Sequence, residues 1–116
     1  LSIQEIGEEL KTISKLCRDL KIDKKEFFGG SMTISSLGGI GGTFFTPIIN
    51  PPEVAILGVG KSYDKLVKDK NKIVSRKILP ISLSYDHRII DGAEGARFCV
   101  YLGKCLGKDF AFKLAV

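Results

Sequence analysis

Apolar residues near the start of the chain recur at alternating intervals of four and three positions. They are Ile6, Leu10, Ile13, Cys17 and Leu20. This spacing keeps them on one face of an α-helix and predicts an amphipathic helix of about five turns. Ser2 followed by Glu5 has the pattern of a capping box, so the helix is predicted to begin directly after Ser2.

The middle of the chain has a different pattern, which favours strands. Three segments are rich in β-branched residues: "SMTISSL" (31–37), "VAILGVGKSY" (54–63) and "KIVSRKILPISLSYD" (72–86). The last two are predicted to pair antiparallel across a lysine-rich turn. Glycine and proline punctuate the segment Gly38–Glu53, which is therefore predicted to be a loop.

A second helix is predicted after position 91. Asp91 and Glu94 repeat the capping-box pattern. The apolar positions that follow occupy more than one face, which predicts a helix covered on several sides. They are Ala93, Ala96, Phe98, Val100, Tyr101, Leu102 and Leu106. No repeat or linker separates these elements, and 116 residues allow one domain at most.

The composition, with 44% hydrophobic and 27% charged residues, is that of an ordinary globular protein. No apolar run approaches the ~20 residues that a membrane helix needs, so no membrane association is expected. The acidic start "LSIQEIGEEL" does not resemble a secretory signal. Three cysteines without metal-ligand spacing predict buried or free thiols in a reducing compartment and no metal site.

The net charge of +5 raises nucleic-acid binding as an alternative. The basic residues concentrate in one segment that contains a single aromatic residue, Tyr63. They are Lys61, Lys65, Lys68, Lys70, Lys72, Arg76 and Lys77. Because aromatic residues do not alternate with the cations, we favour a solvated turn between strands and expect no nucleic-acid partner.

The one histidine of the chain, His87, lies between Asp86 and Arg88 and four positions before Asp91. A lone histidine is more often a surface or structural residue than a catalytic one. Its neighbours change this interpretation, because the stretch "DHRIIDG" (86–92) places the histidine between an acid and a base, with a second acid four positions later.

Two segments, "TISSLGGIGGTFFTPIINPPEVAILGVGK" (33–61) and "LPISLSYDHRIIDGAEGARF" (79–98), resemble the dihydrolipoamide acyltransferase core of the 2-oxo acid dehydrogenase complexes. The resemblance covers nearly the whole chain. "DHRIIDG" matches that family's D-H-R-x-x-D-G signature, and "TISSLGG" looks more like the acetyl-transferring members than the succinyl or branched-chain members. The resemblance implies an α/β (α+β, two-layer) fold like that of chloramphenicol acetyltransferase, a mixed sheet layered with helices. Residues 1–116 would be about the C-terminal half of that catalytic domain.

The family resemblance also implies a chemistry, the transfer of an acetyl group between coenzyme A and dihydrolipoamide. His87 is then expected to act as the general base that deprotonates the attacking thiol. The resemblance assigns oxyanion stabilisation to Ser35, the first serine of "TISSLGG". Asp91 is expected to support the site as a helix cap. Coenzyme A and lipoamide would be substrates, with the lipoyl group carried on a domain that this chain lacks.

The same resemblance implies a homotrimer that builds a larger core, with the decarboxylase and dihydrolipoamide dehydrogenase as partners. The location would be the bacterial cytoplasm or the mitochondrial matrix. Ser35 and His87 are expected to meet between neighbouring subunits, so this chain alone is expected to be inactive. The apolar ending, Phe110, Phe112, Leu114 and Val116, is expected to dock into a neighbouring trimer. A non-catalytic scaffold and a succinyl or branched-chain acyltransferase remain as alternatives.

Overall fold

A computed structural model describes residues 1–107. The predicted docking ending, which begins with Phe110, lies outside the described residues. The described chain divides into two units, one containing Leu1–Gly30 and residues 102–107, the other containing Ser31–Tyr101. The second unit holds every residue to which we assign a role in the chemistry.

The first unit begins with helix α1, Ile3–Arg18, which confirms the predicted helix and its capping box. The backbone N–H of Glu5 donates to Ser2 Oγ at 3.1 Å, and the Ser2 N–H donates to the Glu5 carboxylate at 2.6 Å. The helix ends before Leu20, whose φ of 55° is left-handed and leaves the helical path. A short 3₁₀ helix, η1, follows at Lys24–Phe27.

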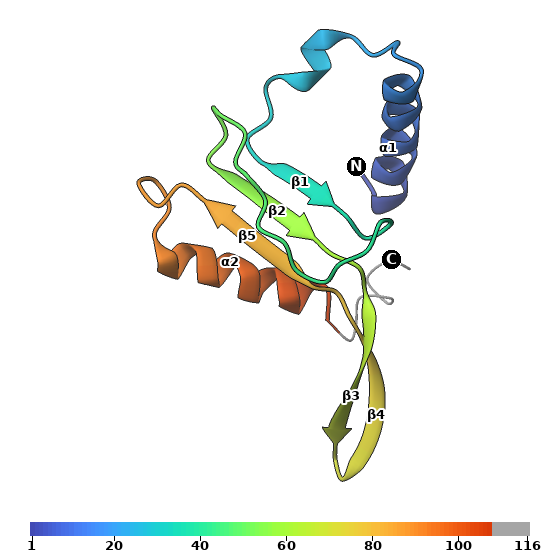
Figure 1. Ribbon diagram of the computed structural model, residues 1–116, viewed down its shortest axis with the longest axis vertical. Coiled ribbons are helices and arrows are strands. Elements are labelled where there is room, and N and C mark those ends of the chain that lie inside the picture. Colours follow the sequence, from blue (N-terminus) through green and yellow to red (C-terminus); the bar gives the residue numbers. More distant parts are fainter. Residues whose placement is uncertain (108–116) are drawn as a thin grey trace. The chain divides into compact units, whose positions relative to one another are not determined.

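The second unit is built on a mixed three-stranded sheet (Figure 1). Its strands are β1, Thr33–Ser36; β2, Ala55–Val59; and β5, Ile81–Tyr85, in the order β1-β2-β5. β1 runs parallel to β2, and β5 runs antiparallel to it. The connection from β1 to β2 contains the Gly- and Pro-rich segment, which forms no strand or helix, as predicted.

The basic segment is a β-hairpin, so most of its lysines lie on two paired strands and not in the predicted turn, although they are exposed to solvent as predicted. β3, Tyr63–Asp69, pairs antiparallel with β4, Lys72–Ile78, and only Lys70 and Asn71 form the turn. Both turn residues have positive φ, 46° and 66°, as a two-residue hairpin turn of type I′ requires. The predicted strands 54–63 and 72–86 are each interrupted, the first at Gly60–Ser62 and the second at Leu79–Pro80.

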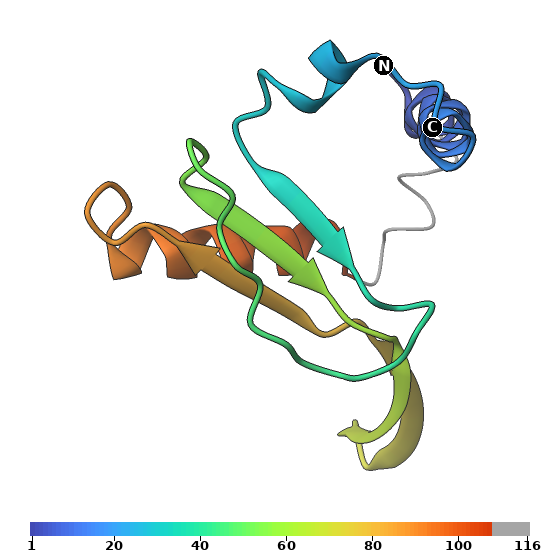
Figure 2. The ribbon, with the colours of Figure 1, turned by 45° about the horizontal axis from the view of Figure 1, so that its top comes forward.

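Helix α2, Gly92–Cys105, lies beside β5 in both ribbon views (Figure 2). Their contact is close, because a Cβ atom on Gly95 would lie 2.9 Å from the ring of Tyr85. Gly95 is the one buried residue of α2. The prediction that this helix is covered on several sides is wrong for the chain by itself. Phe98, Val100 and Tyr101 are exposed, since the described chain supplies no element to cover them.

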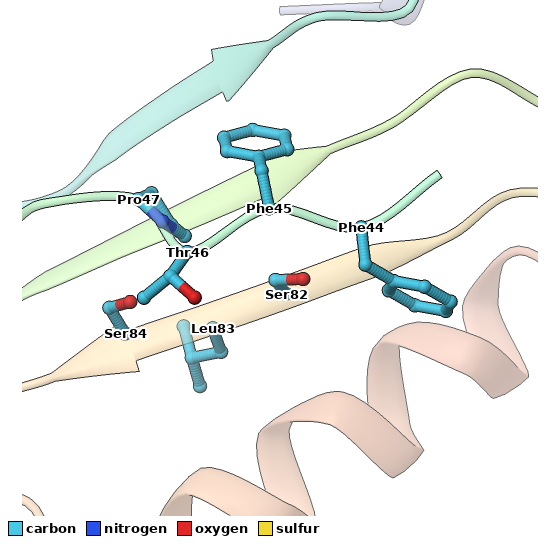
Figure 3. A pocket seen from close by; sticks show the side chains of 7 residues that line it. All are labelled: Phe44, Phe45, Thr46, Pro47, Ser82, Leu83 and Ser84. Carbon is cyan, nitrogen blue, oxygen red and sulfur yellow. The ribbon is translucent and has the colours of Figure 1, made fainter. Parts of the chain in front are cut away.

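Residues 44–47 cross the sheet on the face that carries Gly58, Ser82 and Ser84 (Figure 3). The ring of Phe45 lies over Gly58, where a Cβ atom would come within 2.8 Å of it. Position 58 therefore accepts no side chain without moving Phe45. Between this segment and β5 is a pocket of about 250 Å³ lined by Phe44, Phe45, Thr46, Pro47, Ser82, Leu83 and Ser84.

Candidate active site

The turn that follows β5 carries the signature stretch, and Asp86 fixes its shape. The Asp86 N–H donates to the carbonyl of Val54 at 2.8 Å, which attaches the turn to the chain entering β2. The Asp86 carbonyl accepts from the N–H groups of Ile89 and Ile90 at 3.0 and 2.9 Å. The side chain of Asp86 accepts from the Arg88 guanidinium at 2.9 and 2.7 Å and from the Arg88 N–H at 3.0 Å. Asp86 and Arg88 are therefore each other's partners, and they hold His87 between them.

These bonds favour the ionised form of Asp86. Hydrogen bonds from the side chain and then the backbone of Arg88 lower the pKa of Asp86 to about 2, from an ordinary value of 3.8. The same contact raises the pKa of Arg88. The turn therefore contains an ion pair between Asp86 and Arg88 at neutral pH.

We expect this pair to make the stability of the turn depend on pH. Because the pKa of Asp86 is lower in the folded state, its contribution is present above about pH 4 and is lost as the pH falls towards 2. The free energy of unfolding of the full-length protein should therefore exceed that of Asp86→Asn by an amount that shrinks over this range. Urea unfolding at a series of pH values measures it, with Arg88→Gln as a second variant lacking the pair. A difference that stays constant down to pH 2.5 would contradict the assignment.

His87 presents its imidazole to solvent. Its ring centroid lies 5.7 Å from that of Tyr85, with 33° between the ring planes. Gly92 lies beside both side chains, since a Cβ atom there would be 3.8 Å from His87 Nε2 and 3.7 Å from the Tyr85 hydroxyl. The glycine of the signature thus leaves the space beside Nε2 open to an incoming group.

His87 lines an open cavity of about 670 Å³. One wall is formed by residues 49 and 51–54, which precede β2, and the other by residues 85–89. A cavity of this volume is of the size that small-molecule sites occupy. An exposed imidazole at its wall can take a proton from a bound thiol or return one to it.

Asp91 lies where the sequence placed it, at the start of α2. Its Oδ1 accepts from the Glu94 N–H at 2.8 Å, which satisfies one of the free N–H groups at the helix terminus. The capping box would also need the Asp91 N–H to donate to the Glu94 carboxylate. That second hydrogen bond does not form among the described residues, so only the Asp91 cap is present. Asp91 therefore connects the turn that holds His87 to the helix that packs on Tyr85.

Ser35 does not meet His87 within the chain. Ser35 is level with Gly58 of β2, and Gly58 is level with Ser82 at the start of β5. His87 follows the opposite end of β5, beyond Tyr85. Two strand spacings sideways and three residues along the strand separate Ser35 from Tyr85 by roughly 14 Å between Cα atoms. The sheet thus holds the two predicted residues near opposite ends.

A residue that the sequence did not single out, Glu53, also lines the His87 cavity. The hydroxyl of Thr33 lies 2.9 Å from both oxygens of its carboxylate, in a part-buried position. Glu53 stands 34 positions before His87, so no local spacing relates them. The only available signal was that Glu53 falls inside the first resembled segment.

Within residues 1–107 no three His, Cys, Asp or Glu side chains lie together as metal ligands would. No helix in that part of the chain combines the length and apolar character needed to cross a bilayer.

A comparison with protein families matches residues 1–111 to the 2-oxoacid dehydrogenases acyltransferase (catalytic domain) family. The match spans nearly the whole sequence, so the chain belongs to this family. The family prediction made from "DHRIIDG" and "TISSLGG" is thereby confirmed.

Individual relatives indicate the acetyl branch. The chain is 56% identical over 108 residues to the dihydrolipoyllysine-residue acetyltransferase component of the pyruvate dehydrogenase complex of Cupriavidus necator. That alignment covers 93% of this chain and 19% of the relative. The chain therefore spans about a fifth of the length of this curated relative.

Solved structures confirm the predicted fold. The chain matches Azotobacter vinelandii dihydrolipoamide acetyltransferase with a TM-score of 0.89 and 47% identity, covering 96% of this chain and 46% of that one. It matches the cubic core of the pyruvate dehydrogenase multienzyme complex with a TM-score of 0.89 and 46% identity, again covering 96% and 46%. The fold is thus that of an acyltransferase catalytic core, of which the chain covers somewhat less than half.

Proposed function

We propose that the full-length protein containing this chain transfers an acetyl group between coenzyme A and dihydrolipoamide. The observation that carries the proposal is the exposed imidazole of His87, which lies at the wall of an open cavity on a turn fixed by the Asp86–Arg88 pair. Residues 1–116 would form the C-terminal portion of the catalytic domain. Coenzyme A and the lipoyl group act as substrates in this reaction.

The reaction begins when His87 takes the proton from a substrate thiol, because the thiolate is the nucleophile. The thiolate attacks the thioester carbonyl and forms a tetrahedral oxyanion, to which the Ser35 hydroxyl donates a hydrogen bond. The intermediate collapses, the carbon–sulfur bond of the leaving thiol breaks, and the departing thiolate takes the proton from the imidazolium. Every step is reversible, so the same groups serve transfer in either direction.

The spacing of the three predicted residues supports their roles. The structure of the Azotobacter vinelandii enzyme was determined to study a serine, a histidine 52 positions later and an asparagine four positions after that in its catalytic mechanism. Ser35 and His87 are also 52 positions apart, and Asp91 follows His87 by four. This chain therefore has an acid where that enzyme has an amide. Either side chain offers an oxygen that can cap a helix, in agreement with the contact between Asp91 and Glu94.

We also propose that the site forms between subunits of a homotrimer that builds a larger core. The separation of Ser35 from His87 within the sheet supports this, because one chain cannot bring them within hydrogen-bonding distance. A closed three-fold ring joins unlike surfaces and can place the Ser35 of one subunit beside the His87 of the next. A lone copy of the chain is then expected to be inactive.

Mixed trimers test this arrangement. Full-length Ser35→Ala and His87→Ala proteins are unfolded together in equal amounts and refolded. If sites are shared, one boundary in four pairs an intact serine with an intact histidine, so activity should return to about a quarter of the wild type. Each variant refolded alone is the control. A mixture no more active than these controls would place both residues of a site in one chain.

We also infer the protein partners and the cellular location from the family to which the chain belongs. The decarboxylase and dihydrolipoamide dehydrogenase components are the expected partners, and the cubic core found for a structural relative is consistent with a large assembly. The expected location is the bacterial cytoplasm or the mitochondrial matrix. Co-purification of the full-length protein with these two components tests the partner assignment.

A further inference from the structure

The acidic side chains that line the His87 cavity outnumber the basic ones. Its acidic and basic lining residues, leaving His87 aside, are Glu53, Asp86 and Arg88. Asp86 and Arg88 neutralise each other through bonds of 2.9 and 2.7 Å. In residues 1–107 no cation lies within ion-pair distance of Glu53, whose recorded partner is the neutral hydroxyl of Thr33. Glu53 thus lines this cavity with a charge that no cation of residues 1–107 pairs with.

The position of Glu53 is fixed on two sides. The Thr33 hydroxyl lies 2.9 Å from both carboxylate oxygens and attaches the side chain to the start of β1. The next residue, Val54, accepts from the Asp86 N–H at 2.8 Å, which attaches the backbone to the turn that carries His87. Glu53 is thus fixed between the start of β1 and the turn that carries His87, and it lines the same cavity as His87.

The acyl group must enter this region during transfer. A thiol that gives its proton to His87 must lie within hydrogen-bonding distance of the imidazole, and the carbonyl carbon that it attacks lies about 3–3.5 Å from the sulfur. The substituent on that carbonyl therefore lies within several ångströms of the imidazole, at the cavity that Glu53 also lines. An acetyl group carries no charge, whereas a succinyl group ends in a carboxylate.

We propose that Glu53 sets acyl specificity by repelling acyl groups that carry a carboxylate. The inference rests on the proposed acetyl transfer and adds the residue that rejects the succinyl donor. Two like charges within about 10 Å at a partly buried site disfavour binding by about tenfold or more. The repulsion acts against one class of donor and leaves uncharged donors unaffected, which is how an unfavourable contact provides specificity.

The test uses the full-length protein and three donors: acetyl-, butyryl- and succinyl-coenzyme A. Butyryl matches succinyl in chain length and lacks the charge, so the pair separates repulsion from size. In Glu53→Gln, which keeps an oxygen able to accept from Thr33, kcat/KM for the succinyl donor should rise at least about tenfold relative to the wild type. The values for acetyl and butyryl donors should change less than about threefold.

Thr33→Val is the matched control, because it removes the hydroxyl contact and keeps the charge. Its preference for butyryl over succinyl should stay close to that of the wild type. An equal gain for butyryl and succinyl donors in Glu53→Gln would mean that space is limiting and would overturn the inference. So would an unchanged butyryl-to-succinyl ratio in a protein that transfers acetyl normally. A wild-type protein without acetyl transfer would instead refute the proposed function and the inference with it.

Discussion

In the full-length protein, His87→Ala is expected to lower the rate of acetyl transfer by about two to four orders of magnitude. This is the usual contribution of a positioned general base, and removal of the imidazole leaves the thiol without a proton acceptor. Coenzyme A binding should change little, because the loss falls on proton transfer. The His87 side chain is exposed and makes no hydrogen bond to any other residue within 1–107, so the variant should also fold normally.

The measurement is the steady-state rate of acetyl transfer from acetyl-coenzyme A to dihydrolipoamide, together with coenzyme A binding by calorimetry. A rise in KM with an unchanged kcat would assign His87 to substrate binding. Near-normal turnover would contradict the assignment of His87 as the general base. A wild-type protein that transfers no acetyl group would instead favour the alternative of a non-catalytic scaffold.

The second large effect is expected at Ser35. If its hydroxyl donates to the oxyanion, Ser35→Ala should cost about 2.7 to 4 kcal/mol in transition-state stabilisation, a loss of about 10²- to 10³-fold in kcat. The carbonyl of the bound thioester is less charged than the oxyanion, so substrate binding should fall much less.

Ser36 provides the matched control for Ser35. It is the next residue of β1, and successive side chains in a strand point to opposite faces. Ser36→Ala removes an equivalent hydroxyl from the opposite face of the strand and should leave turnover within a few-fold of the wild type. A reversal, in which Ser36→Ala is the severe variant, would show that the motif has been placed one residue too early.

Elements defined by local signals could be predicted from the sequence. The capping box of Ser2 and Glu5 and the cap at Asp91 act within one helical turn, and both appear in the structure. The hairpin was missed because its turn, Lys70 and Asn71, contains no glycine and adopts positive φ through lysine and asparagine. The breaks after β2 and β4 depend on non-local bonds, such as that of the Gly60 N–H to the Pro80 carbonyl at 3.0 Å.

The candidate site shows the same division. His87 could be identified because its signature is contiguous, and the turn bonds of Asp86 are local as well. The separation of Ser35 from His87 depends on the register of β1, β2 and β5, which the sequence alone does not determine. Glu53 could not be identified from the sequence, because its contact with Thr33, 20 positions away, and its place at the cavity exist only in the folded chain.

The hairpin of β3 and β4 makes the distribution of charge along the chain strongly uneven. Residues 61–79 contain seven lysines and arginines and two aspartates, a net of +5, which equals the net charge of the whole chain. The other residues together are neutral. Ion-exchange retention of this chain should therefore be governed by the hairpin. Any long-range pull towards an acidic surface acts first on the hairpin and fades once added salt shortens the Debye length to a few ångströms.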